Sequence, residues 1–137
     1  MALPRGIRNN NPLNIRKGND WKGERQHQSD PSFEEFESIQ MGLRAGFIIL
    51  RNYQRTSLAP KMRANTIRKI INRWAPASEN NTLKYIDTVA KRSGLNPDEL
   101  IAFRDKPRML AVVEAMCFVE CGQAIDKEII SSAYDLT

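Results

Sequence analysis

The chain has 137 residues and a formal net charge of +5, with 27% charged and 41% hydrophobic residues. This length fits one domain over residues 1–137 and is too short for two ordinary domains. The apolar content excludes a disordered chain, and no apolar run reaches the roughly 18 residues that span a bilayer. The start of the chain lacks the apolar core of a secretory signal, so we expect synthesis in a cytoplasm without a signal peptide.

Cysteine and histidine usage bears on metal and disulfide chemistry. Cys117 and Cys121 lie one helical turn apart in an apolar stretch, which is typical of buried thiols. Together with the single His27 they have no metal-ligand spacing, so we expect no metal site. The positive charge suits nucleic acid, an anionic membrane surface or an acidic polymer equally well.

The composition of the chain changes at about residue 38. Residues 1–37 are rich in Asn, Gly, Pro and Asp and predict loops with one small hairpin at most. Apolar residues at helical spacing then predict a core helix over residues 39–53. Thr66 is the expected N-cap of a second helix, which ends at Trp74 before Pro76.

A third helix is expected to begin at a cap on Asn81 or Thr82 and to end at Gly94. Its buried face should comprise Leu83, Ile86, Val89 and Ala90. A brief helical piece is expected over residues 100–103.

Next, Asp105 should cap a helix that has Pro107 in its first turn and continues to Glu120, and a short last helix should follow Asp126. Residues 109–121 of this segment are apolar on every face except at Glu114 and Glu120, which predicts a buried helix.

Glu120 is the candidate for acid catalysis. Burial raises the pKa of a carboxyl, and the negative end of the helix dipole disfavours the anion in the last turn. A carboxylic acid that keeps its proton beside an opening is what cleavage of a glycosidic bond needs. The pattern leaves the alternative open that Glu120 is solvated or paired with Arg or Lys. Glu114 points elsewhere on the helix, and we expect it in a buried or partly buried ion pair.

Three segments carry a family resemblance. The string Arg8-Asn9-Asn10-Asn11-Pro12-Leu13-Asn14-Ile15-Arg16, followed by Trp21-Lys22-Gly23, resembles the Asn-rich segment of bacteriophage peptidoglycan-degrading proteins and a pattern of cell-wall glucosaminidases. The stretch from Trp74 to Thr82, with Tyr85-Ile86, is similar to an element of lytic transglycosylases. Val119-Glu120-Cys121-Gly122 looks like their Glu-Ser-Gly catalytic turn. The family usually has Gly at the position of Leu13 and Asn or Ser at that of Cys121.

The resemblance covers roughly residues 6–125 and implies a fold. In ordinary lysozyme-like enzymes the catalytic glutamate lies near the start of the domain, whereas here its counterpart lies near the end. The implied fold class is therefore mainly α, a lysozyme-like α+β domain with a loop-rich N-terminal lobe, circularly permuted.

The resemblance also implies a function. Glu120 would protonate the oxygen between N-acetylmuramic acid and N-acetylglucosamine in peptidoglycan glycan strands, as a muramidase or a lytic transglycosylase, without metal or cofactor. A second carboxylate could come from the loops, although solvated loop charges are the ordinary role of Asp20, Asp30, Glu34 and Glu35. The protein would be made in the bacterial cytoplasm and reach the wall after lysis, through a holin-type pore or in a phage virion.

Several residues are candidates for binding the sugars. The amides of Asn10, Asn11 and Asn14 could bind N-acetyl groups and hydroxyls, or could satisfy backbone groups in tight turns. Flat faces for pyranose rings could come from Trp21, Trp74 and Tyr85, which could equally pack in the core. Asn80 is exposed by pattern and matches a family position.

Two other functions compete. A catalytically inactive virion or wall-binding module would keep the same fold and groove. Nucleic-acid binding is suggested by a basic run, but no recognised nucleic-acid-binding motif accompanies it, so no nucleic-acid partner is expected. The run comprises Arg51, Arg55, Lys61, Arg63, Arg68, Lys69 and Arg73.

Overall fold

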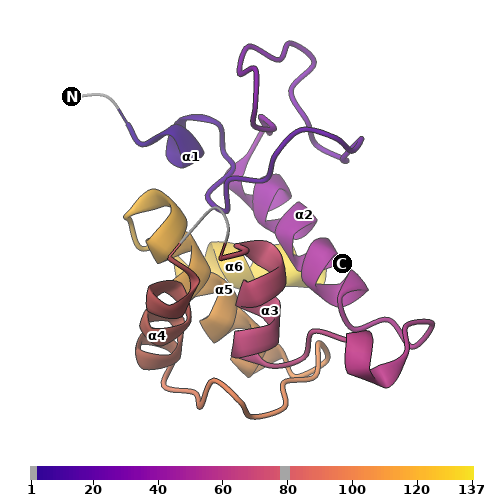
Figure 1. The fold of residues 1–137 in the computed structure, drawn as a ribbon. Helices are drawn as coiled ribbons and strands as arrows, with labels where there is room; N and C mark the ends of the chain where they lie inside the picture. Colours follow the sequence, from indigo (N-terminus) through magenta and orange to yellow (C-terminus); the bar gives the residue numbers. More distant parts are fainter. Residues whose placement is uncertain (1–2, 78–80) are drawn as a thin grey trace.

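The structure is a computed structural model that describes residues 3–77 and 81–137. It is mainly helical, as predicted (Figure 1). The helices are α1 (Arg5–Arg8), α2 (Ile39–Asn52), a short 3-10 helix η1 (Pro60–Met62), α3 (Ile67–Trp74), α4 (Thr82–Ser93), α5 (Lys106–Cys121) and α6 (Lys127–Asp135). Over the described ranges, β structure is limited to two isolated antiparallel bridges, Arg16 with Phe33 and Glu24 with Phe36.

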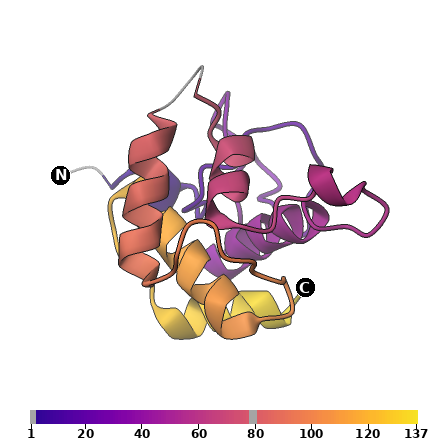
Figure 2. The ribbon, with the colours of Figure 1, turned by 60° about the horizontal axis from the view of Figure 1, so that its bottom comes forward.

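Helix α5 is the centre of the helical part. It packs against α4 on one side and α6 on another, and α6 in turn packs against α2 (Figures 1 and 2). The residues that α5 buries are Met109, Val112, Val113, Ala115, Met116, Cys117 and Cys121. The prediction of a buried helix here is confirmed, and both cysteines are buried free thiols.

Local capping signals place the helix starts correctly. The side chains of Thr66, Asn81 and Asp105 each accept a hydrogen bond from a backbone N–H in the first turn of α3, α4 and α5. Gly94 and Gly122 follow α4 and α5 in the left-handed conformation, with φ of 75° and 72°. This geometry is the usual way for a helix to end at glycine.

Three expectations about the helices are wrong or incomplete. Leu83 is 74% exposed, because α4 faces its neighbours with Thr82, Tyr85, Ile86 and Val89. Residues 100–103 form no helix; the Ile101 N–H donates to the carbonyl of Asn65 at 2.8 Å, which ties this segment to the start of α3. The four-residue helix α1 was not predicted.

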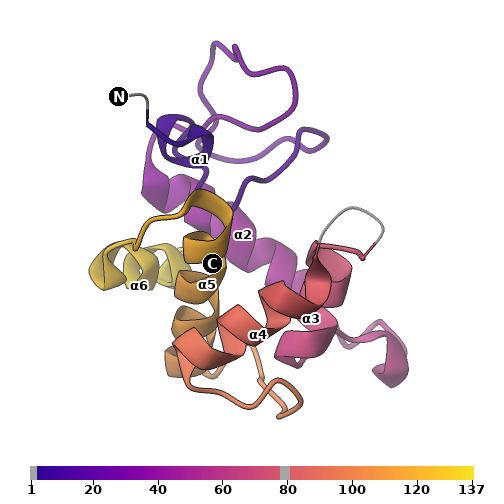
Figure 3. The same cartoon turned by 60° about the vertical axis from the view of Figure 1, so that its left-hand side comes forward.

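The loop-rich N-terminal lobe, residues 3–38, lies across one end of the helical part (Figures 1 and 3). Two glycines of α2 allow the close approach. A Cβ atom on Gly42 would collide with the main-chain carbonyl of Asn10, and one on Gly46 would collide with the side chain of Leu13. The lobe therefore sits directly on α2, with Leu13 fully buried between them.

None of the helices described is both long and apolar enough to cross a membrane.

Candidate active site

Glu120 lies at the end of α5 that meets the N-terminal lobe. It is the last residue but one of the helix, which stops at Gly122. Helix α1 reaches this end because Gly6 has no side chain; a Cβ there would lie 2.9 Å from the Asn11 carbonyl oxygen and 3.3 Å from the Cys121 Cβ. The lobe and the end of α5 are thus held in direct contact around the carboxyl group.

Three side chains from different parts of the chain donate hydrogen bonds to the Glu120 carboxyl. The Tyr85 hydroxyl, on α4, lies 2.9 Å from Oε2. The Asn14 amide, from the lobe, lies 3.2 Å from Oε1 and 3.1 Å from the Glu120 carbonyl oxygen. Trp74, the last residue of α3, supplies the third. Asn14, Trp74 and Tyr85 were all predicted site residues, and the fold brings them together at Glu120.

The surroundings of Glu120 act on its pKa in opposite directions. Burial is the largest effect and raises the pKa above its ordinary value, whereas the hydrogen bonds from Tyr85, Asn14 and Trp74 and the charge of Arg16 lower it. The net pKa is raised. Glu120 thus keeps a proton at a higher pH than a solvated glutamate does, while the donors around it are ready to stabilise the anion.

Glu120 borders two surface hollows. One, of about 460 Å³, is lined by Asn14, Ile15, Arg16, Asn19, Phe33, Ile49, Tyr53, Trp74, Ala75 and Glu120. The other, of about 480 Å³, is lined by Asn81, Lys84, Tyr85, Thr88, Phe118, Val119 and Glu120. Because Glu120 borders both, an extended chain molecule could lie in the two hollows with one bond at the carboxyl.

Other predicted site residues lie away from these hollows. Asn11 is fully buried, and its amide bonds the backbone of Ile15 and Glu34 at 2.9 to 3.0 Å. The Asn10 amide donates to the Phe36 carbonyl. Trp21 packs against the core. Asn80 lies outside the described residues.

Asn11 nevertheless has a part in the site. Its two-way hydrogen bonding closes the turn over residues 11–15, and its carbonyl accepts from the Asn14 N–H at 2.9 Å. Asn14 stands in the left-handed region, with φ of 53°. The turn therefore fixes the unusual backbone geometry that directs the Asn14 amide at Glu120.

Two of the other candidate acids, Asp30 and Glu35, are held by contacts within the lobe. Asp30 takes the Arg5 guanidinium at 2.6 Å and the Asn9 amide at 2.9 Å, which holds the pKa of Asp30 well below its usual range. Glu35 accepts from the Ser29 and Asp30 N–H groups. Among the acids in the described ranges, only Glu120 lines the hollow of about 460 Å³ or the hollow of about 480 Å³. Glu114 forms a two-pronged ion pair with Arg92 at 2.8 and 2.9 Å, as expected.

Much of the basic run is engaged within the protein. Arg63 donates to the carbonyls of Leu58 and Thr56, and Arg68 pairs with Asp98. Two more of its arginines, Arg51 and Arg73, donate to main-chain carbonyls. These four arginines therefore have structural roles within the protein.

Sequence reasoning overlooked Arg16, Tyr53 and Phe118, which also line the hollows. Arg16 stands inside the Asn-rich string, but a single charged residue in a loop gives no signal of its own. Tyr53 and Phe118 follow helical apolar patterns that indicate core packing equally well.

Comparison with known proteins relates the chain to a phage protein. No family model matches the chain. The chain is 43% identical over 122 residues to "Protein P5" of Pseudoalteromonas phage PM2, and the match covers 86% of this chain and 71% of the phage protein. The chain belongs to the family of this phage protein. The predicted relationship to phage proteins is therefore confirmed.

Proposed function

We propose that this P5-family protein cleaves the glycan strands of peptidoglycan with Glu120 as the general acid. The observation that carries the proposal is the setting of Glu120, which borders two hollows and has a partly buried carboxyl with a raised pKa, held by three donors. A glycosidase acid has to hold a proton near neutral pH and release it to the leaving oxygen. The proposed setting is lysis of the host or penetration of its wall by a phage.

The chemistry follows from the groups around Glu120. As the bond from the anomeric carbon to the bridging oxygen breaks, the Glu120 proton passes to that oxygen, which leaves as a hydroxyl. Burial raises the pKa of Tyr85, so this residue stays a neutral hydroxyl donor beside the new carboxylate. Asn14 and Trp74 stabilise the same anion. These contacts are stronger to the charged form, so they favour proton transfer.

The anomeric carbon can then be captured in two ways. Water gives a reducing end and requires a second carboxylate or another activating group, whereas the 6-hydroxyl of the same sugar gives an anhydro end and can work with one glutamate. Among the acids described, Glu120 stands alone at the hollows. This arrangement supports a mechanism in which one carboxyl carries the proton transfer.

A lysozyme-like, circularly permuted fold is part of the proposal. What supports it is a buried central helix that ends in the acid, against a loop-rich lobe that supplies Asn14. The Asn-rich lobe precedes that helix in this chain, whereas in the ordinary order the acid comes first.

The test compares two glutamates of the same helix. We expect the wild-type protein to release soluble sugar from purified peptidoglycan sacculi, and Glu120→Gln to lose at least about a thousandfold in rate, as removal of an essential acid does. Glu114→Gln is the matched control, because it makes the same chemical change on α5 but leaves the Glu120 contacts intact. Equal activity of Glu120→Gln and wild type would contradict the proposal. A wild-type protein that binds sacculi and releases nothing would indicate a wall-binding module.

A further inference from the structure

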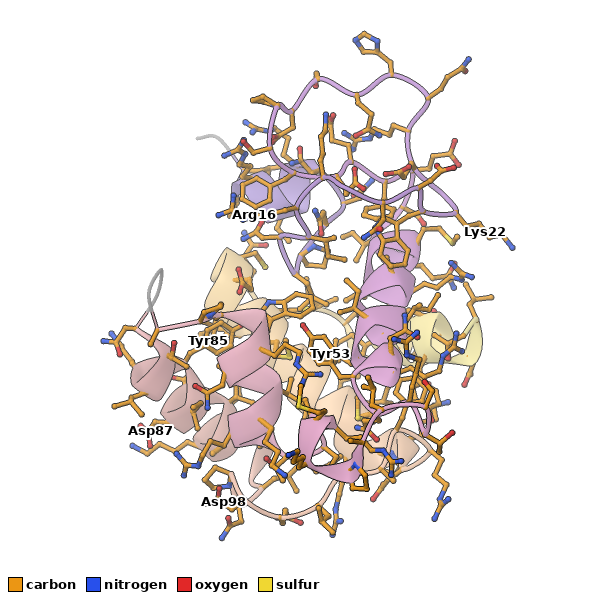
Figure 4. All side chains as sticks on the ribbon, turned by 45° about the vertical axis from the view of Figure 1, so that its right-hand side comes forward. Arg16, Lys22, Tyr53, Tyr85, Asp87 and Asp98 are labelled. Carbon is orange, nitrogen blue, oxygen red and sulfur yellow. The ribbon has the colours of Figure 1, made fainter. Side chains whose placement is uncertain are left out.

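Arg16 is a cation beside Glu120, and its charge acts on that carboxyl. It lines the hollow of about 460 Å³ on the lobe side of the carboxyl. Figure 4 shows Arg16 on the lobe, with Tyr85 and Tyr53 on the helical part across from it. Within residues 3–77 and 81–137, Arg16 makes no ion pair and its side chain makes no hydrogen bond.

A second arginine at the same ring shows the contrast. Arg5 and Arg16 both place their guanidinium groups over Phe33, at 4.5 and 5.2 Å from the ring centroid. Arg5 is also paired with the buried Asp30 through two hydrogen bonds. The guanidinium of the exposed Arg16 thus lies against Phe33 in the lining of the hollow, and its N–H groups are left for a ligand. An arginine in this position is suited to a planar two-oxygen anion such as a carboxylate.

Glu120 cannot be that anion for Arg16 during catalysis. The two groups interact only through their charges, and Glu120 carries its proton before the reaction in the mechanism proposed above. The site thus has a positive charge beside the carboxyl that donates the proton. An uncharged sugar polymer would leave this charge without a partner.

We propose that Arg16 binds a carboxylate on the glycan in the lobe-side hollow, so that the site selects strands with acidic substituents over uncharged N-acetylglucosamine polymers. The inference rests on the proposed function, because it assumes that a glycan occupies these hollows. Two sources share the chemistry. One is the lactyl carboxylate of muramic acid in strands without peptides, and the other is a carboxylate of the attached peptide.

The test measures binding in the Glu120→Gln background, where turnover is expected to be about a thousandfold slower and Arg16 cannot act through the pKa of Glu120. Three probes are used: glycan strands stripped of their peptides, strands with peptides attached, and N-acetylglucosamine tetramers. We expect Arg16→Gln to weaken binding of at least one acidic probe about fivefold, as for a partly exposed ion pair, and to leave the tetramer within about twofold. Loss on the stripped strands identifies the lactyl group, and loss only on the peptide-bearing strands identifies the peptide.

Arg104→Gln is the matched control, since Arg104 is an exposed arginine that lines a different hollow. Equal losses on acidic and uncharged probes, or an equal effect of Arg104→Gln, would overturn the role of Arg16 and leave the proposed function standing. If no probe binds the parent protein, the proposed function fails, and the inference fails with it. A higher salt concentration should weaken the binding of acidic probes only when Arg16 is present.

Discussion

Glu34 gives the stability of this protein a specific dependence on pH. Glu34 is only 3% exposed, and its Oε2 atom has no hydrogen-bond donor among the described residues. Burial and the neighbouring carboxyl of Glu24 raise the pKa of Glu34 from 4.5 to about 7, with a smaller contribution from Asp20 and an opposing one from Lys17. A buried carboxylate without a donor is unfavourable, so the folded protein holds Glu34 protonated.

The sign and size of the stability change follow from the pKa of Glu34 in the unfolded chain, 4.5, and in the folded protein, about 7. Below pH 4.5 Glu34 is protonated in both the folded and the unfolded chain, and it carries no penalty. As the pH rises from 4.5 through about 7, the unfolded chain loses this proton first, so the folded state loses stability over that window. At about 1.4 kcal/mol per pH unit, the loss reaches about 3 kcal/mol above pH 7.

Glu34→Gln removes this titration while keeping the shape of the side chain. We expect the variant to match wild type at about pH 4 and to exceed it by up to about 3 kcal/mol at about pH 8, which is about 10 °C in Tm for a chain of this size. Urea unfolding followed by circular dichroism at both pH values measures the difference. Glu37→Gln is the control, because Glu37 is exposed in the same loop. A difference between Glu34→Gln and wild type that does not change with pH would show that Glu34 does not titrate with a raised pKa in the folded protein.

Three further variants test the site and its support. Tyr85→Phe removes a donor that lowers the pKa of Glu120, so the alkaline limb of the pH-rate profile should move to higher pH; a move to lower pH would contradict this role. Asn11→Ala removes three buried hydrogen bonds and should cost about 3 kcal/mol in urea unfolding, whereas a cost below about 1 kcal/mol would argue against the buried turn. Gly42→Ala puts a methyl group against the Asn10 carbonyl and should lower stability by about 2 kcal/mol, with wild-type stability as the contrary result.

The parts of the fold that were predictable from sequence depend on local signals. The start of α3 at Thr66 and the end of α5 at Gly122 follow from capping chemistry within a few residues. The burial of α5 follows from its apolar faces. Leu83 shows the limit of such reasoning, because helical periodicity places apolar residues on a face and cannot say how far that face is covered.

The assembly of the site depends on contacts between distant residues. Asn14 and Glu120 are 106 positions apart, and no local pattern indicates that they meet. Glu120 stands out in the sequence as a glutamate of an apolar helix, and the resemblance to peptidoglycan-degrading proteins adds to that signal. That resemblance also singles out the asparagine string that holds Asn14. It could not separate the roles of neighbouring asparagines, because the same amide can bind a sugar or a backbone group. The turn over residues 11–15 gives the two asparagines different roles. It buries Asn11 and directs the Asn14 amide at the Glu120 carboxyl.

Mass spectrometry of the glycan ends shows whether Glu120 protonates a glycosidic oxygen of peptidoglycan. After incubation with purified sacculi, we expect wild type and Glu114→Gln to release soluble muropeptides cut between N-acetylmuramic acid and N-acetylglucosamine, with either anhydro or reducing ends. We expect none from Glu120→Gln. The same fragments from Glu120→Gln, or no newly formed ends from wild type, would contradict it.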